Sequence, residues 1–134
     1  QRYNQAWLLD QVNYQPFWGF ARVAVQDDRL KEALQHFETS IELCGDEYQK
    51  VALLSDAAMV NAYAGEFQRA NSLFAESTAM DPNYDRSWYR WSQSLFLEGN
   101  YPEAWVKLRR AEALGANVSD AYLRDLRKKL PEPE

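Results

Sequence analysis

The sequence has few of the residues that mark an enzyme or a metal protein. Its 134 residues include one cysteine, Cys44, and one histidine, His36, so no disulfide can form within the chain. These two side chains would lie about 12 Å apart along a helix, which is too far for both to ligate one metal ion directly. No glycine-rich phosphate-binding pattern is present. We therefore predict no catalytic residue, no cofactor and no metal site, and read His36 as a bystander on a helix surface.

Long apolar runs and an excess of basic residues are also missing. No stretch of about 18 apolar residues could span a membrane, and no signal-peptide pattern opens the chain. The net charge of −5 argues against duplex nucleic acid as a partner, because phosphate contacts depend on clustered Lys and Arg. We expect a soluble fragment that does not insert into a membrane. The sequence does not fix the compartment, although the cytoplasm is slightly favoured over the periplasm.

Hydrophobic residues make up 46% of the chain, which is enough for a sizeable core. Between residues 85 and 116 they form two stripes of helical period, separated by Gly99, and this pattern predicts a helical hairpin. The stripes consist of Trp88, Trp91, Ser92 and Leu95, and of Ala104, Leu108, Ala111 and Leu114.

Equivalent residues recur upstream of this hairpin. Within each equivalent set the members are separated by 37 and then by 34 residues. A constant interval predicts an array of repeats, here with a period of 34 and three extra residues around Gly45 to Lys50. We expect the extra residues to lengthen the helix within 46–64 by about one turn. Two such sets are Asp28, Gly65 and Gly99 in the turns, and Ala33, Ala70 and Ala104 in the second helices.

These repeats resemble the tetratricopeptide repeat family, whose units share a Trp-x2-Leu-Gly-x2-Tyr run, an Ala-x3-Phe pair and a closing proline. The resemblance covers about residues 1 to 118, and only Pro82 stands at the closing position. It implies an all-α fold, a right-handed superhelical array of antiparallel helix pairs. The matching residues are Phe17, Phe20, Ala21, Ala24, Ala33 and Phe37; Leu54, Ala57, Ala58, Asn61, Ala70 and Phe74; and Trp88, Trp91, Ser92, Leu95, Ala104 and Leu108.

The repeat boundaries follow from the same intervals. Because the chain opens inside a repeat, we expect it to be part of a longer protein. Helices are predicted from Pro16 to about Gln26, over Leu30–Leu43 and Phe67–Met80, and from an N-cap at Ser119 to about Lys129. The predicted units are 1–13, the second helix of a truncated preceding repeat; 14–50, 51–84 and 85–118, three complete repeats; and 119–134, a capping helix with a disordered tail.

The resemblance also implies a peptide-binding groove, lined by the face of each first helix that is turned away from the second helix. At about 100° per residue, that face carries fifteen residues without an acid among them. Exposed aromatic and arginine side chains are favoured at interfaces. We therefore predict a scaffold or adaptor that binds a peptide with acidic and apolar groups. The candidate groove residues are Trp18, Arg22, Met59, Tyr63, Arg86, Tyr89, Arg90, Gln93 and Phe96.

Several alternatives remain open. The groove aromatics could pack against the next unit or against each other. The array could also be a structural or assembly domain of a larger, possibly membrane-bound bacterial enzyme, with its groove filled internally. Basic residues near the end of the chain could attract an acidic partner, and the half-repeat at residues 1–13 could support self-association.

A sharper alternative is that the groove clamps a partner's C-terminal carboxylates, as some family members do. Arg86 and Arg90 match the two basic positions that these members use in their third repeat. Trp18, Arg22 and Asp56 depart from the pattern. Asp56 in particular is expected to repel a carboxylate.

Overall fold

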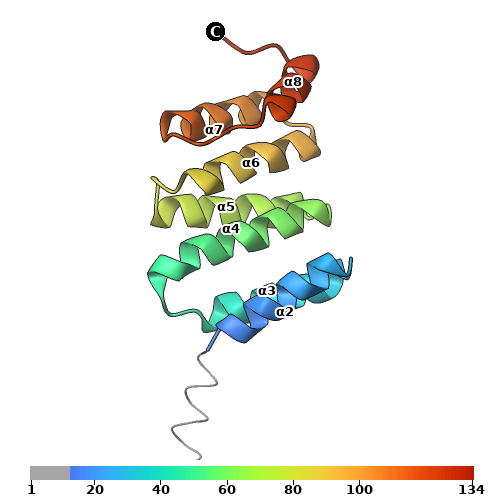
Figure 1. The fold of residues 1–134 in the computed structure, drawn as a ribbon, viewed down its shortest axis with the longest axis vertical. Helices are drawn as coiled ribbons and strands as arrows, with labels where there is room; N and C mark the ends of the chain where they lie inside the picture. Colours follow the sequence, from blue (N-terminus) through green and yellow to red (C-terminus); the bar gives the residue numbers. More distant parts are fainter. Residues whose placement is uncertain (1–12) are drawn as a thin grey trace, which may run out of the picture.

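A computed structural model describes residues 13–134 (Figure 1). The helix predicted for residues 1–13 therefore lies almost entirely outside the described residues. Within 13–134 every regular element is a helix, so the predicted all-α class is confirmed for this part of the chain. None of the helices described there has the length and apolar character needed to cross a membrane. The helices are α2 (Gln15–Gln26), α3 (Leu30–Leu43), α4 (Glu47–Tyr63), α5 (Phe67–Met80), α6 (Asp85–Glu98), α7 (Tyr101–Ala113) and α8 (Asp120–Lys129).

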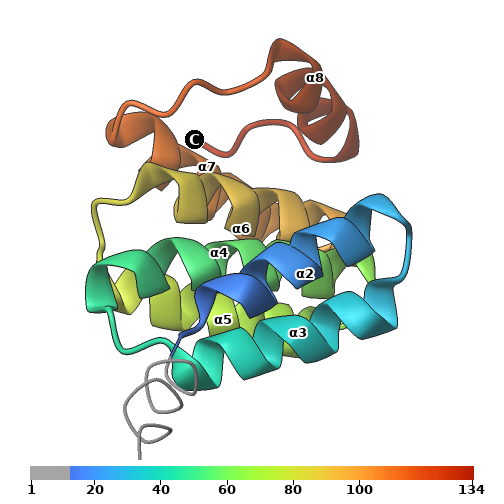
Figure 2. The same ribbon diagram turned by 60° about the horizontal axis from the view of Figure 1, so that its bottom comes forward.

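The helices pack in the order of the chain. Helices α2 and α3, α4 and α5, and α6 and α7 form three hairpins, each closed by a short turn. Figure 1 shows these hairpins one above another along the long axis of the molecule, with α8 at the far end, and Figure 2 shows α2 lying over α3 and α4 over α5. Helix α4 also contacts α3 and α6, which makes it the central element.

The three hairpins close with the same turn. Asp28, Gly65 and Gly99 have φ angles of 59°, 80° and 89°, in the left-handed region that glycine adopts without steric cost. In each turn the amide of the next residue donates to a carbonyl five positions earlier, at 2.8 Å. The predicted turn residues therefore share one local structure.

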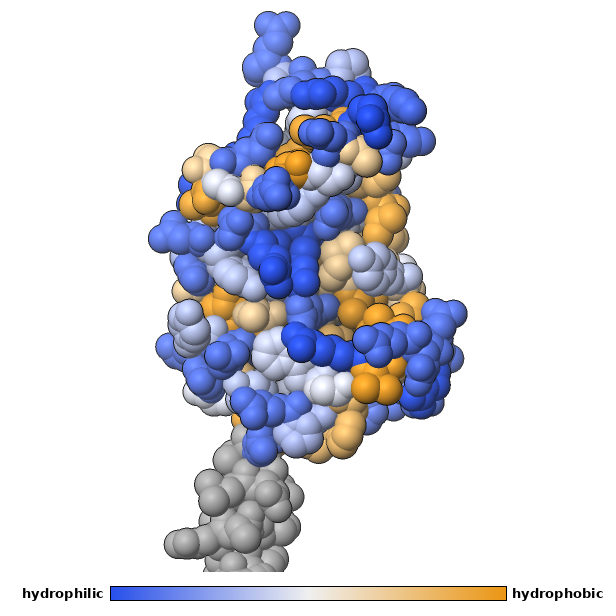
Figure 3. Space-filling model, viewed as in Figure 1, coloured by the Kyte–Doolittle hydropathy of each residue, from blue (hydrophilic) through white to orange (hydrophobic). Residues whose placement is uncertain are grey.

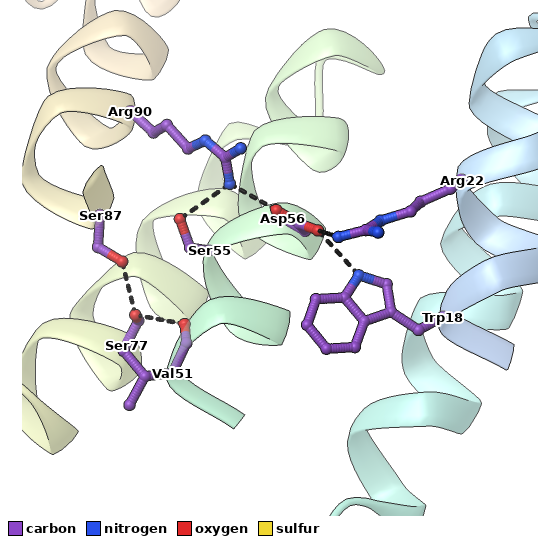
Figure 4. Close-up of polar contacts among 8 residues, drawn as sticks. All are labelled: Trp18, Arg22, Val51, Ser55, Asp56, Ser77, Ser87 and Arg90. Atoms are coloured by element: carbon purple, nitrogen blue, oxygen red, sulfur yellow. Dashed lines mark hydrogen bonds and ion pairs between the residues drawn. The ribbon is translucent and has the colours of Figure 1, made fainter. Parts of the chain in front are cut away.

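A buried serine joins the two helices of the first and second hairpins. Ser40 Oγ donates to the carbonyl of Tyr14 at 2.9 Å. Ser77 Oγ donates to the carbonyl of Val51, also at 2.9 Å, and Figure 4 shows this second bond. Both bonds tie the second helix to the beginning of the first, and both span 26 residues. In the third hairpin the equivalent residue is Ala111, which has no hydroxyl group.

Helix α4 contains the three extra residues, as predicted. It has 17 residues, against 12 in α2 and 14 in α6. Its first turn is capped by the Asp46 side chain, which accepts hydrogen bonds from the amides of Tyr48 and Gln49 at 3.0 and 3.3 Å. Ten of its residues are buried.

Two hydrophobic clusters form the core. The larger is built from α2 to α5 around Phe37, Leu54 and Phe74, and the smaller from α6 to α8 around Trp105 and Leu126. Trp91 packs against both and so joins them. On the face shown in Figure 3, polar residues predominate and apolar residues gather in a band on the right-hand side.

The predicted ends of α3, α5 and α8 are confirmed. Ser119 caps α8 by accepting a hydrogen bond from the amide of Tyr122. The tail predicted to be disordered, residues 131–134, has no regular secondary structure and is exposed, and its disorder stays a prediction; two contacts join the segment after α8 to α7. The indole of Trp105 donates to the carbonyl of Leu130 at 2.9 Å, and Arg109 donates to the carbonyl of Pro133.

Candidate functional site

Three neighbouring hollows lie along the first helices of the hairpins. The first, of about 350 Å³, lies between α2, α4 and α6; the second, of about 200 Å³, lies between α4, α6 and α8. The third, of about 380 Å³, lies between α6 and the segment after α7. Met59, Tyr63 and Gln93 line both the first and the second hollow, while Arg90 and Gln93 line both the first and the third. They therefore form one continuous depression, called here the groove surface.

The structure brings most of the predicted residues onto this surface. Phe96 lines the second hollow, and Arg86 and Tyr89 line the third. Trp18 is half-buried behind the first hollow, where its indole meets Asp56. The predicted residues that line the first hollow are Arg22, Met59, Tyr63, Arg90 and Gln93.

One of the residues that line the first hollow is a carboxylate, Asp56 of α4, whose polar contacts are drawn in Figure 4. Its Oδ2 accepts hydrogen bonds from Trp18 Nε1 at 2.8 Å and from Arg22 Nη2 at 3.1 Å, both from α2. Its Oδ1 accepts one from Arg90 Nη1 of α6 at 2.6 Å, and the same nitrogen lies 3.2 Å from Ser55 Oγ. One side chain thus joins three first helices.

The environment of Asp56 keeps its carboxyl group ionised. Burial by itself would raise its pKa, because a charge is poorly solvated there. The hydrogen bond and the positive charge of Arg90, together with the hydrogen bonds from Trp18 and Arg22, outweigh burial and lower the pKa below its ordinary value. The carboxylate is therefore a fixed negative charge at neutral pH.

None of the fifteen residues of the predicted face is acidic, but two acids outside that set line the groove surface, Asp56 in the first hollow and Asp85 in the third. Asp56 also does more than repel a carboxylate, since it binds cations from two other helices. The contact between Asp56 and Arg90 could have been predicted from the sequence. The two residues are 34 positions apart, which is the interval between equivalent positions of α4 and α6. These two opposite charges face each other across the contact between α4 and α6.

Arg22 and Arg90 differ in the exposure of their side chains and in the number of their bonding partners. The Arg90 side chain is 26% exposed and is already bound to Ser55 and Asp56. The Arg22 side chain is 64% exposed and stacks over the ring of Trp18, 4.9 Å from its centroid. Arg22 and the exposed Arg86 are consequently the cations that an incoming ligand meets first.

The lining of the second hollow contains no charged residue. Tyr63 is 59% exposed and Leu97 is 49% exposed, and both line the second hollow with Met59 and Phe96. Exposed aromatic and aliphatic side chains in one hollow form a surface on which a ligand can bury apolar area. The second hollow therefore differs in chemistry from the first, which contains Asp56 and two arginines.

Helix α8 covers the aromatic residues contributed by the third hairpin. The ring of Tyr122 lies 5.9 Å from that of Tyr89 and 5.7 Å from that of Phe96. Its hydroxyl is 2.7 Å from Ser92 Oγ, and burial raises the pKa of Tyr122 to about 12. The hydroxyl of Tyr89 accepts a hydrogen bond from the amide of Ser119 at 3.0 Å. Part of the surface of Tyr89 and Phe96 is therefore already covered by the chain itself.

Within residues 13–134 there is no group of three or more His, Cys, Asp or Glu side chains placed to hold a metal ion. No protein-family model matches the chain, and no curated protein matches it. The geometry of the groove surface is consequently the basis on which a function can be proposed.

Proposed function

We propose that this chain is a protein-interaction module that binds a peptide or partner segment on the groove surface. The observation that supports this most directly is the continuity of the three hollows, which share lining residues on α4 and α6. A continuous depression with a charged part and an uncharged part suits an elongated ligand better than a compact one.

The hairpins are, in this proposal, tetratricopeptide-like units of a right-handed superhelical array. Three findings support it: the left-handed residues at 28, 65 and 99, the equivalent serine bonds of the first two hairpins, and the facing of Asp56 and Arg90. Stacked units of this kind bury one another's apolar faces and leave one side of the first helices accessible.

The charges favour a ligand with an acidic group. Asp56 cancels one of the two positive charges beside it, and Asp85 offsets Arg86 in the third hollow, so the groove surface as a whole keeps an excess of one positive charge. A carboxylate of the ligand would meet Arg22 and Arg86, while an apolar side chain of the same ligand would lie between Tyr63 and Leu97. Arg90 is bound to Asp56 and is not part of a free carboxylate clamp.

A second candidate function is a structural or assembly domain whose groove is filled internally. The packing of Tyr122 on Tyr89 and Phe96 favours it, because an element of the chain already occupies that end. The two functions differ in what covers Tyr63 and Leu97. A peptide ligand would cover them reversibly, whereas an internal filler would cover them permanently in the assembled protein.

The test is selection of ligands from a displayed library of random 12-residue peptides, followed by affinity measurement on variants. Tyr63→Ala is the informative change, because this side chain is exposed and lines both the first and the second hollow. Tyr48→Ala is the matched control: the same residue type on the same helix, 85% exposed but outside the groove surface.

We expect selected peptides to lose about tenfold in affinity on the Tyr63 variant, the typical size of an interface aromatic contact, and to bind the Tyr48 variant as they bind the wild type. Arg86→Ala should weaken peptides that carry an acid and leave those without one unchanged. Selected peptides that bind both tyrosine variants equally would show that the groove surface is not the binding site.

A further inference from the structure

The segment after α8 turns back and lies against α7 (Figure 2). Its contacts are made by three side chains. Trp105 Nε1 donates to the carbonyl of Leu130 at 2.9 Å, and Arg109 donates to the carbonyl of Pro133. The carboxylate of Glu132 lies between two guanidinium groups, 3.6 Å from Arg109 Nη2 and 3.8 Å from Arg127 Nη2.

These contacts recognise a particular kind of segment. Trp105 and Arg109 donate hydrogen bonds to backbone carbonyls, and Arg109 and Arg127 form ion pairs with a carboxylate. The segment contains Pro131 and Pro133, whose rings fix φ and which have no backbone N–H to satisfy. A proline-containing chain is extended at little entropic cost and presents its carbonyls to donors. The three side chains are therefore matched to an extended, acidic, proline-containing segment.

The surface under the segment is more basic than the rest of the molecule. Residues 101–130 contain seven Lys and Arg against four Asp and Glu, in a chain whose net charge is −5. Arg109 and Arg127 come from different helices, α7 and α8, and their side chains are 42% and 55% exposed. An acidic segment of another protein would thus meet the same two cations.

The contacts of the segment are also of a kind that can be exchanged. Exposed ion pairs contribute little to stability, since water solvates both partners almost as well. The Glu132 side chain is 44% exposed, so a carboxylate from solution can compete for its place. What favours the chain's own segment is its proximity, which gives it a high effective concentration.

We infer that Trp105, Arg109 and Arg127 form a docking seat for an extended, acidic, proline-containing segment of a partner protein, and that residues 130–133 fill this seat until the partner displaces them. The seat lies beyond α6, at the α7–α8 end of the molecule, so it is separate from the groove surface and does not depend on the proposed function.

The probe for the seat is a fluorescent peptide with the sequence of residues 129–134, measured by anisotropy. We expect a chain ending at Lys129 to bind it about fivefold or more tightly than the full chain, because the competing segment, including the Leu130 carbonyl that occupies Trp105, is gone. Glu132→Gln in the full chain should give a smaller gain. A probe with glutamine in place of both glutamates should bind several-fold more weakly.

Arg127→Ala in the shortened chain should reduce binding by about tenfold, which is the loss expected when an arginine–carboxylate contact is removed. Arg124→Ala, on the same helix but outside the seat, is the matched control and should bind as the shortened chain does. Binding should also shift the NMR resonance of the Trp105 indole N–H, which reports on the bonded donor itself.

Equal affinity of the full and shortened chains for the probe, or undiminished binding by the Arg127 variant, would overturn the inference. Equal binding of the probe with glutamates and the probe with glutamines would also overturn it, because the seat would then not recognise the carboxylate. Should the shortened chain fail to fold, the Glu132→Gln variant and the indole resonance decide the matter in the full chain.

Discussion

The two junctions between successive hairpins are built from different chemistry. At the first, between α2–α3 and α4–α5, the polar links are ionic. Asp56 binds Arg22, and Arg69 binds Glu38 with two hydrogen bonds of 3.0 and 2.8 Å. The Glu38 and Arg69 side chains are each 43% exposed, so this link is solvated.

At the second junction, between α4–α5 and α6–α7, buried contacts predominate. The ring of Trp91 stacks on that of Phe74, with 6.0 Å between centroids and 13° between planes. The Trp91 indole donates to Asn71 Oδ1 at 3.0 Å, and Ser77 Oγ lies 2.7 Å from Ser87 Oγ in the interior (Figure 4). The larger hydrophobic cluster also spans the first boundary, so the two boundaries differ mainly in their additional contacts, which are solvated ion pairs at the first and buried aromatic and hydroxyl contacts at the second.

The largest effect is expected from removing the packing at the second junction. Phe74→Ala deletes a fully buried ring that supports Trp91, and such changes cost about 3–5 kcal/mol of unfolding free energy. Urea unfolding followed by circular dichroism measures the loss. The exposed Tyr48→Ala should change stability by less than about 0.5 kcal/mol, and a comparable loss in both variants would contradict the assignment of Phe74 to the junction.

Asp56→Asn is expected to have the next largest effect, because it removes the charge that both junctions share. Arg90, whose side chain is 26% exposed, would lose its ionic partner. Hydrogen bonds to charged groups contribute about 1.5–3 kcal/mol, so we expect a loss of about 2 kcal/mol at neutral pH by the same unfolding measurement.

The control for this change is Glu38→Gln, which breaks only the solvated link of the first junction. Exposed pairs are worth less than about 1 kcal/mol, so this variant should lose less than the Asp56 variant does. A loss as large at Glu38 as at Asp56 would mean that the first junction depends on its surface charges and not on the shared carboxylate.

Acidification should erase the difference between wild type and the Asp56→Asn variant. The pKa of Asp56 is lowered in the folded protein, so its contribution to stability is present above the ordinary aspartate pKa of about 3.9 and is lost as pH falls through the folded value. Unfolding free energies of both proteins, measured from about pH 7 down to about pH 3, should converge towards the acidic end. A gap that is constant across this range would show that Asp56 does not act through its charge.

The smallest effect is expected at the turn of the first hairpin. Asp28 has a φ of 59°, where the other two turns have glycine. Asp28→Gly removes the steric cost of a left-handed side chain but adds entropy to the unfolded chain, so we expect a net gain of at most about 1 kcal/mol. Thermal unfolding measures it. Gly65→Asp, which imposes that cost on the second hairpin, should lower stability.

Local signals in the sequence were enough to predict the helices. Proline after Asp81, the left-handed positions 65 and 99, and the N-cap at Ser119 act within one or two turns of the chain. The repeat intervals then indicated which helices form hairpins. These features were predictable because each depends on a few neighbouring residues.

Polar contacts between residues far apart in the sequence could not be predicted from such local patterns. The link between Asp56 and Arg22 joins residues that are not equivalent in the repeats, and it depends on the offset between α2 and α4. Likewise, the residues after Lys129 have the composition of a solvated tail, and only the placement of Trp105 and Arg109 on α7 explains why they lie against it. The helical period was enough to predict most of the candidate groove residues. It did not predict which charges pair with one another on the groove surface.

The sharing of Asp56 by α2 and α6 restricts how the protein can change over time. Exchange at position 56 alone would leave Arg90, whose side chain is 26% exposed, without its ionic partner, whereas Arg22 is 64% exposed and stays solvated. In descendants of this chain, positions 56 and 90 should therefore vary together. Trp18, which carries no charge and makes one hydrogen bond to the carboxylate, would be freer to vary.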